Sequence, residues 1–250
     1  MQSLNFKIDQ YSPLPYYFQL ECYLKQEIER GRWKKGDDLP SEGEVSKMCE
    51  VSLGVVRQAF TRLEKNGLII RQKGKRATVT SGPKMQLEFM GNIASYYTEL
   101  RSKGLKVNTK VMENHIIVPT EQIASNLEID VSQPVVNISR LRLVEDKPIV
   151  YTISYLPTEL CPGIENEDLN DKSLYETVYN KYGLKPKSAE RSFEVVMGDN
   201  YVCNLLEIHA WEPIILIRWI SYLENKRPME YFEGWHTTGN WKFIFHSSIK

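Results

Sequence analysis

Residues 39–79 read LPSEGEVSKMCEVSLGVVRQAFTRLEKNGLIIRQKGKRATV, and this stretch decides the fold of the N-terminal part of the chain. Ser41 and Glu44 have the S-x-x-E spacing of a capping box, which predicts a helix running to about Cys49. Ser52 is the next N-cap candidate, and Gly67 stands where a glycine commonly ends a helix. Between them one apolar helical stripe is expected, formed by Val56, Ala59, Phe60 and Leu63.

The outer face of this second predicted helix is polar and mostly basic, with Arg57, Gln58, Thr61, Arg62 and Lys65. Residues 68–72 and 77–80 read as two strands around the turn Lys73-Gly74-Lys75-Arg76. A basic helix followed by a basic hairpin is typical of a chain that lays a helix in a DNA groove and holds the backbone with a wing. The alternative is a small helical domain with a solvated basic face, which the order of helix and hairpin disfavours.

Upstream, residues 16–29 predict a further helix with apolar residues spaced by four. Together these segments resemble the GntR family of bacterial transcription regulators over about 65 residues, which is a longer match than a single short motif provides. The resemblance rests on Pro15-Tyr16-Tyr17-Phe18-Gln19-Leu20, Gly36-Asp37-Asp38-Leu39-Pro40-Ser41-Glu42, Val56-Arg57-Gln58-Ala59 and Arg62-Leu63-Glu64-Lys65-Asn66-Gly67-Leu68-Ile69.

Charge is distributed unevenly along a chain whose net charge is zero. Residues 1–82 hold 14 Lys and Arg against 10 Asp and Glu, a net charge of +4, and residues 83–250 hold 18 against 22, a net charge of −4. Seven basic residues and one acidic residue lie between Arg57 and Arg76. This concentration of positive charge predicts phosphate contacts, which supply most of the non-specific affinity for DNA.

The remaining composition is that of an intracellular protein without a bound cofactor. The four cysteines, Cys22, Cys49, Cys161 and Cys203, lie far apart in the sequence, so we expect buried thiols rather than disulfides or a zinc site. The N-terminus has no signal-peptide core, and no apolar run approaches membrane-spanning length. We therefore expect a cytoplasmic protein with no metal, no cofactor and no membrane association.

The 250 residues suffice for two domains, and Thr80-Ser81-Gly82-Pro83-Lys84 breaks both the strand and the helix patterns. We predict a DNA-binding domain over residues 1–80, a linker over 81–88 and a second domain over 89–250. Ser95 is a candidate N-cap for a helix running to Arg101.

The second domain contains an internal repeat at an offset of 79 residues. Ile123-Ala124-x-x-Leu127-Glu128-Ile129 aligns with Val202-Cys203-x-x-Leu206-Glu207-Ile208, and Pro134-Val135-Val136-x-Ile138 aligns with Pro213-Ile214-Ile215-x-Ile217. Each copy reads as strand, short helix, strand, turn and strand. Two such copies predict an α+β domain made of one antiparallel sheet with helices on a face.

This second part resembles the UTRA domain of the HutC-type GntR subfamily. The resemblance implies a fold related to chorismate lyase that senses small molecules and forms homodimers. It rests on Leu100-Arg101-x-x-Gly104, Arg140-x-Arg142, Ser154-Tyr155-Leu156-Pro157, Ser173-Leu174-Tyr175-Glu176 and Pro228-x-Glu230-Tyr231.

Arg140 and Arg142 are two residues apart on a predicted strand, so both side chains project from one face among apolar neighbours. Such guanidinium groups are costly to bury unless an anion meets them, and arginine binds phosphate or carboxylate through two parallel hydrogen bonds. The alternative is an outward-facing pair bridged to surface acids. The second repeat copy has Trp219 and Ser221 at the equivalent positions, which favours a binding site over a requirement of the fold.

By the resemblance, an effector's phosphate would be held by Arg140, Arg142, Ser173, Tyr175 and the Ser95-Tyr96-Tyr97 segment, and Glu230 would bind sugar hydroxyls. The chain departs from the subfamily where Thr152 replaces a common acid and where the segment His236 to Trp241 replaces the usual ending. The sequence therefore leaves the sugar-binding half of the site unassigned. His209 and His236 are either ligands or, as is more common, ordinary surface or core residues.

The DNA-reading segment departs as well, because Gly43 and Leu53 stand where relatives commonly have arginine. Arg57 is then the remaining base-reading candidate, whereas phosphate contacts are preserved. The expected DNA-binding residues are Ser41, Ser52, Leu53, Gly54, Arg57, Gln58, Lys73, Gly74, Lys75 and Arg76.

These features predict a bacterial transcription regulator, in the first instance a repressor, that binds double-stranded operator DNA and a small phosphate- or carboxylate-bearing effector such as a sugar phosphate. Two alternatives stay open. One is an enzyme of chorismate lyase-like fold with an accessory DNA-binding arm, although the sequence has no catalytic triad, metal cluster or phosphate loop at diagnostic spacing. The other is a structural protein whose effector site no longer functions.

Overall fold

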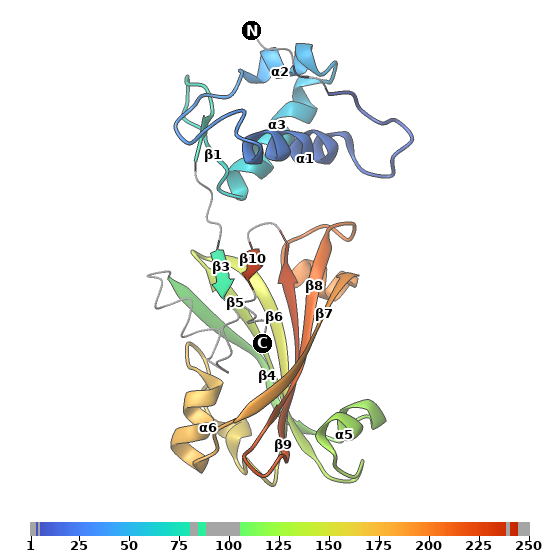
Figure 1. Cartoon of the computed structure of the whole chain (residues 1–250), viewed down its shortest axis with the longest axis vertical. Coiled ribbons are helices and arrows are strands. Elements are labelled where there is room, and N and C mark those ends of the chain that lie inside the picture. Colours follow the sequence, from blue (N-terminus) through green and yellow to red (C-terminus); the bar gives the residue numbers. More distant parts are fainter. Residues whose placement is uncertain (1–3, 5, 81–84, 89–105, 239–240, 245–250) are drawn as a thin grey trace, which may run out of the picture. The chain divides into compact units, whose positions relative to one another are not determined.

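The computed structural model describes residue 4 and residues 6–80, 85–88, 106–238 and 241–244. Its contacts divide the chain into two compact units, Met1–Gln86 with Gly239–Lys242, and Leu87–Thr238 with Phe243–Lys250. Both units are drawn in Figure 1.

The first unit has three helices and a short hairpin: α1 (Tyr16–Glu29), α2 (Glu42–Met48), α3 (Leu53–Lys65), β1 (Ile69–Ile70) and β2 (Thr78–Val79). Both halves of the predicted capping box form, since the Glu44 backbone N–H donates to Ser41 Oγ at 3.3 Å and the Ser41 N–H donates to Glu44 Oε2 at 2.7 Å. Ser52 caps α3 by accepting from the Val55 N–H at 3.3 Å. The predicted helix starts are confirmed.

The core of this unit is the apolar stripe of α3 packed against its neighbours. All four predicted stripe residues are buried, and they contact Leu20 and Leu24 of α1, Val45 of α2 and Ile69 of the hairpin. The predicted strands were too long, because antiparallel pairing is limited to Ile69 with Val79 and Ile70 with Thr78. The basic turn between them is therefore a loop closed by a minimal ladder.

One residue of the expected basic face is placed elsewhere. Arg62 is half-buried and its Nε donates to Glu21 of α1, whose other carboxylate oxygen accepts from the Asn66 amide at 2.9 Å. A buried carboxylate requires such partners. Glu21 and Arg62 meet because α1 packs against α3. Arg62 therefore joins two helices instead of belonging to the outer basic face.

The second unit is built on one six-stranded antiparallel sheet in the order β4-β5-β6-β9-β8-β7 (Figure 1). β3 and β10 pair separately as a two-stranded sheet. The strand limits are β3 (Met85–Glu88), β4 (Val107–Ile117), β5 (Val135–Val144), β6 (Lys147–Pro157), β7 (Ser188–Met197), β8 (Pro213–Tyr222), β9 (Pro228–Thr237) and β10 (Trp241–Ile244).

The sequence repeat is a structural repeat. Strands β4-β5-β6 and β7-β8-β9 are the two copies, and β6 and β9 join them in antiparallel register at the centre of the sheet. The short helix of each copy, α5 (Glu121–Leu127) and α7 (Asn200–Leu205), packs on the central strand of the other copy, β9 and β6 respectively. The two copies are therefore interlocked through their helices.

Helices cover both faces of this sheet, whereas one covered face was predicted. Val135 of β5 packs with α5, and its neighbour Val136 packs with α6 (Leu174–Tyr182) and the 3-10 turn η1 (Ile164–Asn166). Adjacent strand residues point to opposite faces, so α6 and η1 lie on the face opposite α5. The face under α6 carries the alternate residues Ile138, Arg140 and Arg142.

Three further expectations concern one helix, the cysteines and membrane association. The helix predicted from Ser95 to Arg101 falls outside the described residues. Cys49, Cys161 and Cys203 are buried thiols, but Cys22 is only half-buried. Within the described ranges, no helix has the length and apolar character required to cross a bilayer.

Candidate functional site

The first candidate site is the exposed N-terminal end of α3. Ser52, Leu53, Gly54, Arg57 and Gln58 are all exposed there, and the Arg57 side chain is 63% exposed. The apolar stripe of α3 packs on the core, so these exposed residues lie on the opposite, outward side of the helix. This arrangement allows a helix end to enter a groove of the double helix.

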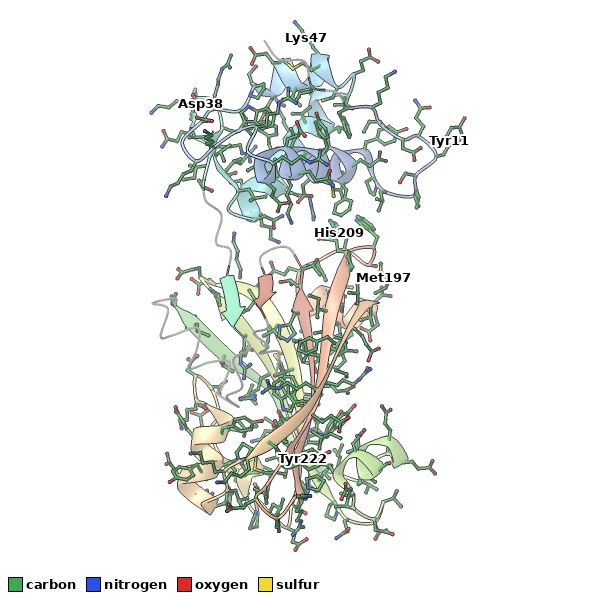
Figure 2. All side chains as sticks on the ribbon, in the orientation of Figure 1. Tyr11, Asp38, Lys47, Met197, His209 and Tyr222 are labelled. Atoms are coloured by element: carbon green, nitrogen blue, oxygen red, sulfur yellow. The ribbon has the colours of Figure 1, made fainter. Side chains whose placement is uncertain are left out.

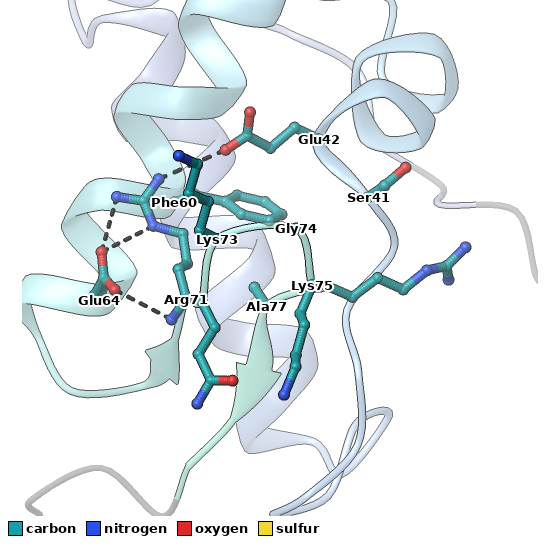
Figure 3. Close-up of a pocket in the computed structure, with 11 residues that line it drawn as sticks. Ser41, Glu42, Phe60, Glu64, Arg71, Lys73, Gly74, Lys75 and Ala77 are labelled. Atoms are coloured by element: carbon teal, nitrogen blue, oxygen red, sulfur yellow. Dashed lines mark hydrogen bonds and ion pairs between the residues drawn. The ribbon is translucent and has the colours of Figure 1, made fainter.

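The turn of the hairpin supplies a second set of exposed groups. Lys73, Gly74, Lys75 and Arg76 are exposed, and Gly74 has φ +79°, a left-handed conformation that a side chain would strain. A groove of about 640 Å³ separates the turn from α3 (Figure 3). Arg71, Glu64, Glu42 and half-buried Ser41 line it together with the turn residues.

Acidic residues beside the groove pair with its arginines. Glu42 Oε2 accepts from Arg57 Nε at 3.1 Å, and Glu44 Oε1 accepts from Arg76 Nη2 at 2.8 Å. Arg71 donates to Glu64 at 2.8 Å and lies 3.5 Å from Glu42 (Figure 3). For the turn lysines, the structure gives no ion pair within the described residues.

Sequence reasoning missed Glu42, Glu64 and Arg71 as members of this surface. The signal available was weak, because an acid in the first turn of a helix is ordinary there for its favourable interaction with the helix dipole. Their pairing with basic residues 7 and 15 positions away becomes visible only when the helices are packed.

The second candidate site is a polar cluster at α6, formed by Arg140, Arg142, Tyr175, Trp219, Glu230 and His236, of which Tyr175 and Trp219 are half-buried and the others are buried. Arg140 is 2% exposed, Arg142 5% and Glu230 1%. Glu230 Oε2 accepts from the Tyr175 hydroxyl at 2.5 Å and from the Trp219 indole at 3.2 Å. The outward-facing alternative for the arginine pair is therefore wrong, since both guanidinium groups are inside the domain.

Burial shifts the protonation equilibria of this cluster. Burial, and secondly the charge of Arg142, lower the pKa of Arg140 to about 9, against the opposing charge of Glu230. Burial, and secondly Arg142, lower the pKa of His236 to about 3, so the imidazole is neutral. Burial and the neighbouring Glu230 raise the pKa of Tyr175, which stays a protonated donor.

The cluster has more positive than negative charge. Glu230 is the carboxylate whose charge raises the pKa of Arg140, whereas Arg142 lowers it. Arg140 Nε and Nη1 have no hydrogen-bond partner among the described residues. Buried guanidinium donors of this kind match an anion with several acceptor oxygens.

The other predicted effector residues are placed less directly. Ser173 is buried and caps α6, accepting from the Glu176 N–H at 3.3 Å, two residues before Tyr175. Ser95, Tyr96 and Tyr97 lie outside the described residues. Thr152 is buried beside Arg140, whose backbone carbonyl lies 3.4 Å from its hydroxyl.

Trp219 and His236 are the cluster members that sequence reasoning did not assign. Trp219 is the repeat equivalent of Arg140, and its ring stacks on Phe232 with centroids 3.5 Å apart. His236 is cross-strand neighbour to Val150, which pairs with Arg142. His209, the other histidine considered, is exposed and stacks on Trp211.

A three-helix head with an exposed basic helix end and wing, joined to a domain with a buried cationic cluster, defines a DNA-binding regulator with a ligand-binding domain. Comparison with known proteins identifies the family. The family described as "Bacterial regulatory proteins, gntR family" matches residues 16–79, and the UTRA domain matches residues 102–239. The chain therefore belongs to the gntR family of bacterial regulatory proteins and carries a UTRA domain.

Relatives match along nearly the whole chain. The HTH-type transcriptional repressor NagR of Bacillus subtilis is 29% identical over 239 residues, covering 96% of this chain and 97% of NagR. The regulator GmuR of the same organism is 27% identical, covering 83% and 88%. The crystal structure of PhnF from Mycobacterium smegmatis matches in fold with a TM-score of 0.65 at 22% identity, covering 92% and 99%.

Family membership excludes the enzyme alternative. The chain is a DNA-binding transcription regulator with an effector domain, and it is not an enzyme. The winged helix-turn-helix and the antiparallel effector domain are both confirmed as elements of this fold.

Proposed function

We propose that this regulator is a HutC-type repressor that acts in the cytoplasm as a homodimer and responds to a small anionic effector. The repressor assignment is supported by the name of NagR, which is a transcriptional repressor. In this proposal the head binds operator DNA and the UTRA domain binds the effector, whose preference for one of two dimer states changes operator affinity.

At the operator, Arg57 is the base-reading residue and the turn residues contact phosphates. Arg57 is exposed at the end of α3 that enters the major groove, and arginine commonly binds guanine O6 and N7 together. Ser41, Ser52, Leu53, Gly54 and Gln58 complete the surface of the helix ends. Lys73, Gly74, Lys75 and Arg76 hold the DNA backbone, chiefly through the charges of the two lysines and the arginine.

At the effector, Arg140 and Arg142 bind a phosphate or carboxylate. The observation that carries this proposal is the pair of buried guanidinium groups near the carboxylate of Glu230, with two Arg140 donors lacking a partner among the described residues. Ser173, Tyr175 and the segment Ser95-Tyr96-Tyr97 contribute further donors, and Glu230 is available to hydroxyl groups. A phosphorylated sugar combines both requirements.

The homodimer is supported by an apolar strip on the sheet-edge strand β7. Phe193, Val195 and Met197 alternate along β7, so they share one face, and they are 38%, 74% and 58% exposed (Figure 2 labels Met197). Antiparallel pairing of two β7 strands about Val195 would place Phe193 opposite Met197 of a second copy. An unprotected edge with apolar side chains is a surface that proteins commonly cover by pairing.

The effector proposal is tested by calorimetry with sugar phosphates, the corresponding neutral sugars and inorganic phosphate. Arg140→Ala and Arg142→Ala should each weaken binding of the phosphorylated ligand by about 2 kcal/mol or more, because a charge-assisted pair is lost inside the protein. Operator binding without effector should survive in both variants, as measured by gel shift.

Arg218→Ala is the matched control, because Arg218 lies on a strand of the same sheet but pairs with Glu233 at 2.8 Å and with Glu194. Its ligand affinity should stay at the wild-type value. A neutral ligand that binds tightly, releases DNA and is insensitive to both cluster variants would contradict the anion proposal. Failure of every ligand to bind wild type would favour a UTRA domain without a functioning site.

A further inference from the structure

Glu42 occupies an unusual place for an acid on a DNA-binding surface. It is the first residue of α2, directly after the N-cap Ser41 and within the capping box that fixes the start of that helix, and its side chain is 30% exposed. A carboxylate at this surface repels phosphate, so its presence has a cost for DNA binding. The two arginines that Glu42 contacts explain why an acid is nevertheless found there.

Both carboxylate oxygens of Glu42 are used by arginines. Oε2 accepts from Arg57 Nε at 3.1 Å, and Oε1 lies 3.5 Å from Arg71 Nη1. Arg71 is itself held by Glu64, through a side-chain bond of 2.8 Å and a backbone bond of 3.1 Å (Figure 3). Glu42 is therefore held in two ways. Its backbone is fixed at the start of α2, and its side chain contacts Arg71, which directly follows β1 of the hairpin.

The contact with Arg57 uses only part of the guanidinium group. Nε is bonded to Glu42, whereas Nη1 and Nη2 form no hydrogen bond to any described residue. The guanidinium is planar, so a bond at Nε also sets the direction of the two terminal amino groups. Guanine O6 and N7 can accept hydrogen bonds from these two amino groups at the same time.

We propose that Glu42 is a positioning residue for base readout, which holds Arg57 in the orientation that reads guanine. The inference rests on the proposed base contact of Arg57. A free arginine on the surface samples many rotamers, and ordering it on DNA costs conformational entropy. Glu42 removes much of that cost before DNA arrives and opposes a swing of Arg57 to a neighbouring phosphate, so it raises discrimination while lowering non-specific affinity.

The experiment uses the full-length protein and an operator recovered by selection from random duplexes. Binding is then measured to that duplex with all four bases at each position, and to random DNA. Arg57→Ala identifies the position that Arg57 reads. Glu42→Gln, which keeps size and removes the charge, should reduce the guanine preference at that same position about tenfold, while affinity for random DNA stays equal or rises.

Glu44→Gln is the matched control, since Glu44 belongs to the same helix, carries the same charge and pairs with Arg76 instead of Arg57. Glutamine also preserves the capping box. This variant should change operator and random-DNA affinity by the same factor and leave every base preference intact. Glu42→Asp, with the charge retained on a shorter side chain, should lie between wild type and Glu42→Gln.

Three results would overturn the inference. Glu42→Gln could leave the guanine preference unchanged, could relax all positions equally, or could keep its effect in the Arg57→Ala background, which would indicate a direct base contact by Glu42. If Arg57→Ala itself alters no base preference, the proposed role of Arg57 fails first and the inference fails with it. Thermal unfolding of each variant separates these results from loss of folding.

Discussion

At the scale of single residues, the chain places ionisable groups where their surroundings decide their role. Arg57 is exposed and able to contact DNA, whereas Arg62, five residues later on the same helix, is half-buried on Glu21. Arg140 and His236 are both buried in the effector domain, but the first keeps its proton near neutral pH and the second does not. Burial therefore separates the arginine proposed for DNA recognition, Arg57, from Arg62, which joins two helices, and from Arg140, which is proposed to bind the effector.

His236 gives the effector domain a specific dependence on pH. Burial lowers its pKa to about 3, below the usual value of about 6.5, so the unfolded chain takes up a proton that the folded domain rejects. Stability from this residue is present above pH 6.5 and falls as the pH decreases. Between pH 7 and 5 the free energy of unfolding should drop by about 2 kcal/mol through His236 alone. His236→Gln should flatten this part of the profile in chemical denaturation, and an unchanged slope in the variant would contradict the assignment.

At the scale of elements, the head depends on how α3 and the hairpin are fastened together. The two-residue ladder of β1 and β2 is too short to hold the turn alone. Arg71 adds a second attachment, from the base of the hairpin to Glu64 of α3. The turn that carries Lys73, Lys75 and Arg76 is thus held beside α3, with a groove between them that Phe60 and Glu64 of α3 help to line.

Replacing Lys73, Lys75 and Arg76 with alanine should weaken binding to operator and to random DNA by similar factors. Each lost phosphate contact should reduce the slope of log affinity against log salt by about one. Fluorescence anisotropy at several salt concentrations measures both quantities. Because Arg76 is paired with Glu44, its share of the loss should be smaller than that of the lysines. Operator affinity that is unchanged across salt concentrations would show that the turn is not a DNA-binding wing.

At the scale of the whole molecule, the repeat in the effector domain produces a six-stranded sheet whose edge strands are β4 and β7. The β7 edge carries exposed apolar side chains, and in the proposed homodimer a second copy covers them. A twofold dimer presents two heads, which is the arrangement needed to read two half-sites of a palindromic operator.

Lysine at Val195 and Met197 should therefore convert the dimer to a monomer, because charge on an edge strand opposes pairing. Light scattering after gel filtration reports the mass, and a gel shift should show weaker binding to a palindromic site. Val118→Lys is a suitable control, since Val118 is 76% exposed but lies outside β7. A dimer that persists in the double variant, or one that Val118→Lys disrupts equally, would place the interface elsewhere.

Local patterns in the chain were sufficient to predict most elements of this protein and their order. Capping residues and the 3.6-residue period specified α1, α2 and α3, because these signals act within a few residues of chain. The repeat specified two equivalent halves, and the spacing of Arg140 and Arg142 specified that both arginines share a face. Local patterns of this kind are readable because each depends on neighbouring positions alone.

Only the tertiary structure decided which distant side chains meet. Packing of α1 on α3 took Arg62 away from the basic face, and the approach of α2 to α3 brought Glu42 to Arg57. The joining of β6 and β9, with α6 above them, placed Glu230 and Tyr175 beside Arg140. These contacts link residues 15 to 90 positions apart, and burial decides their charge states, so no local pattern in the chain contains them.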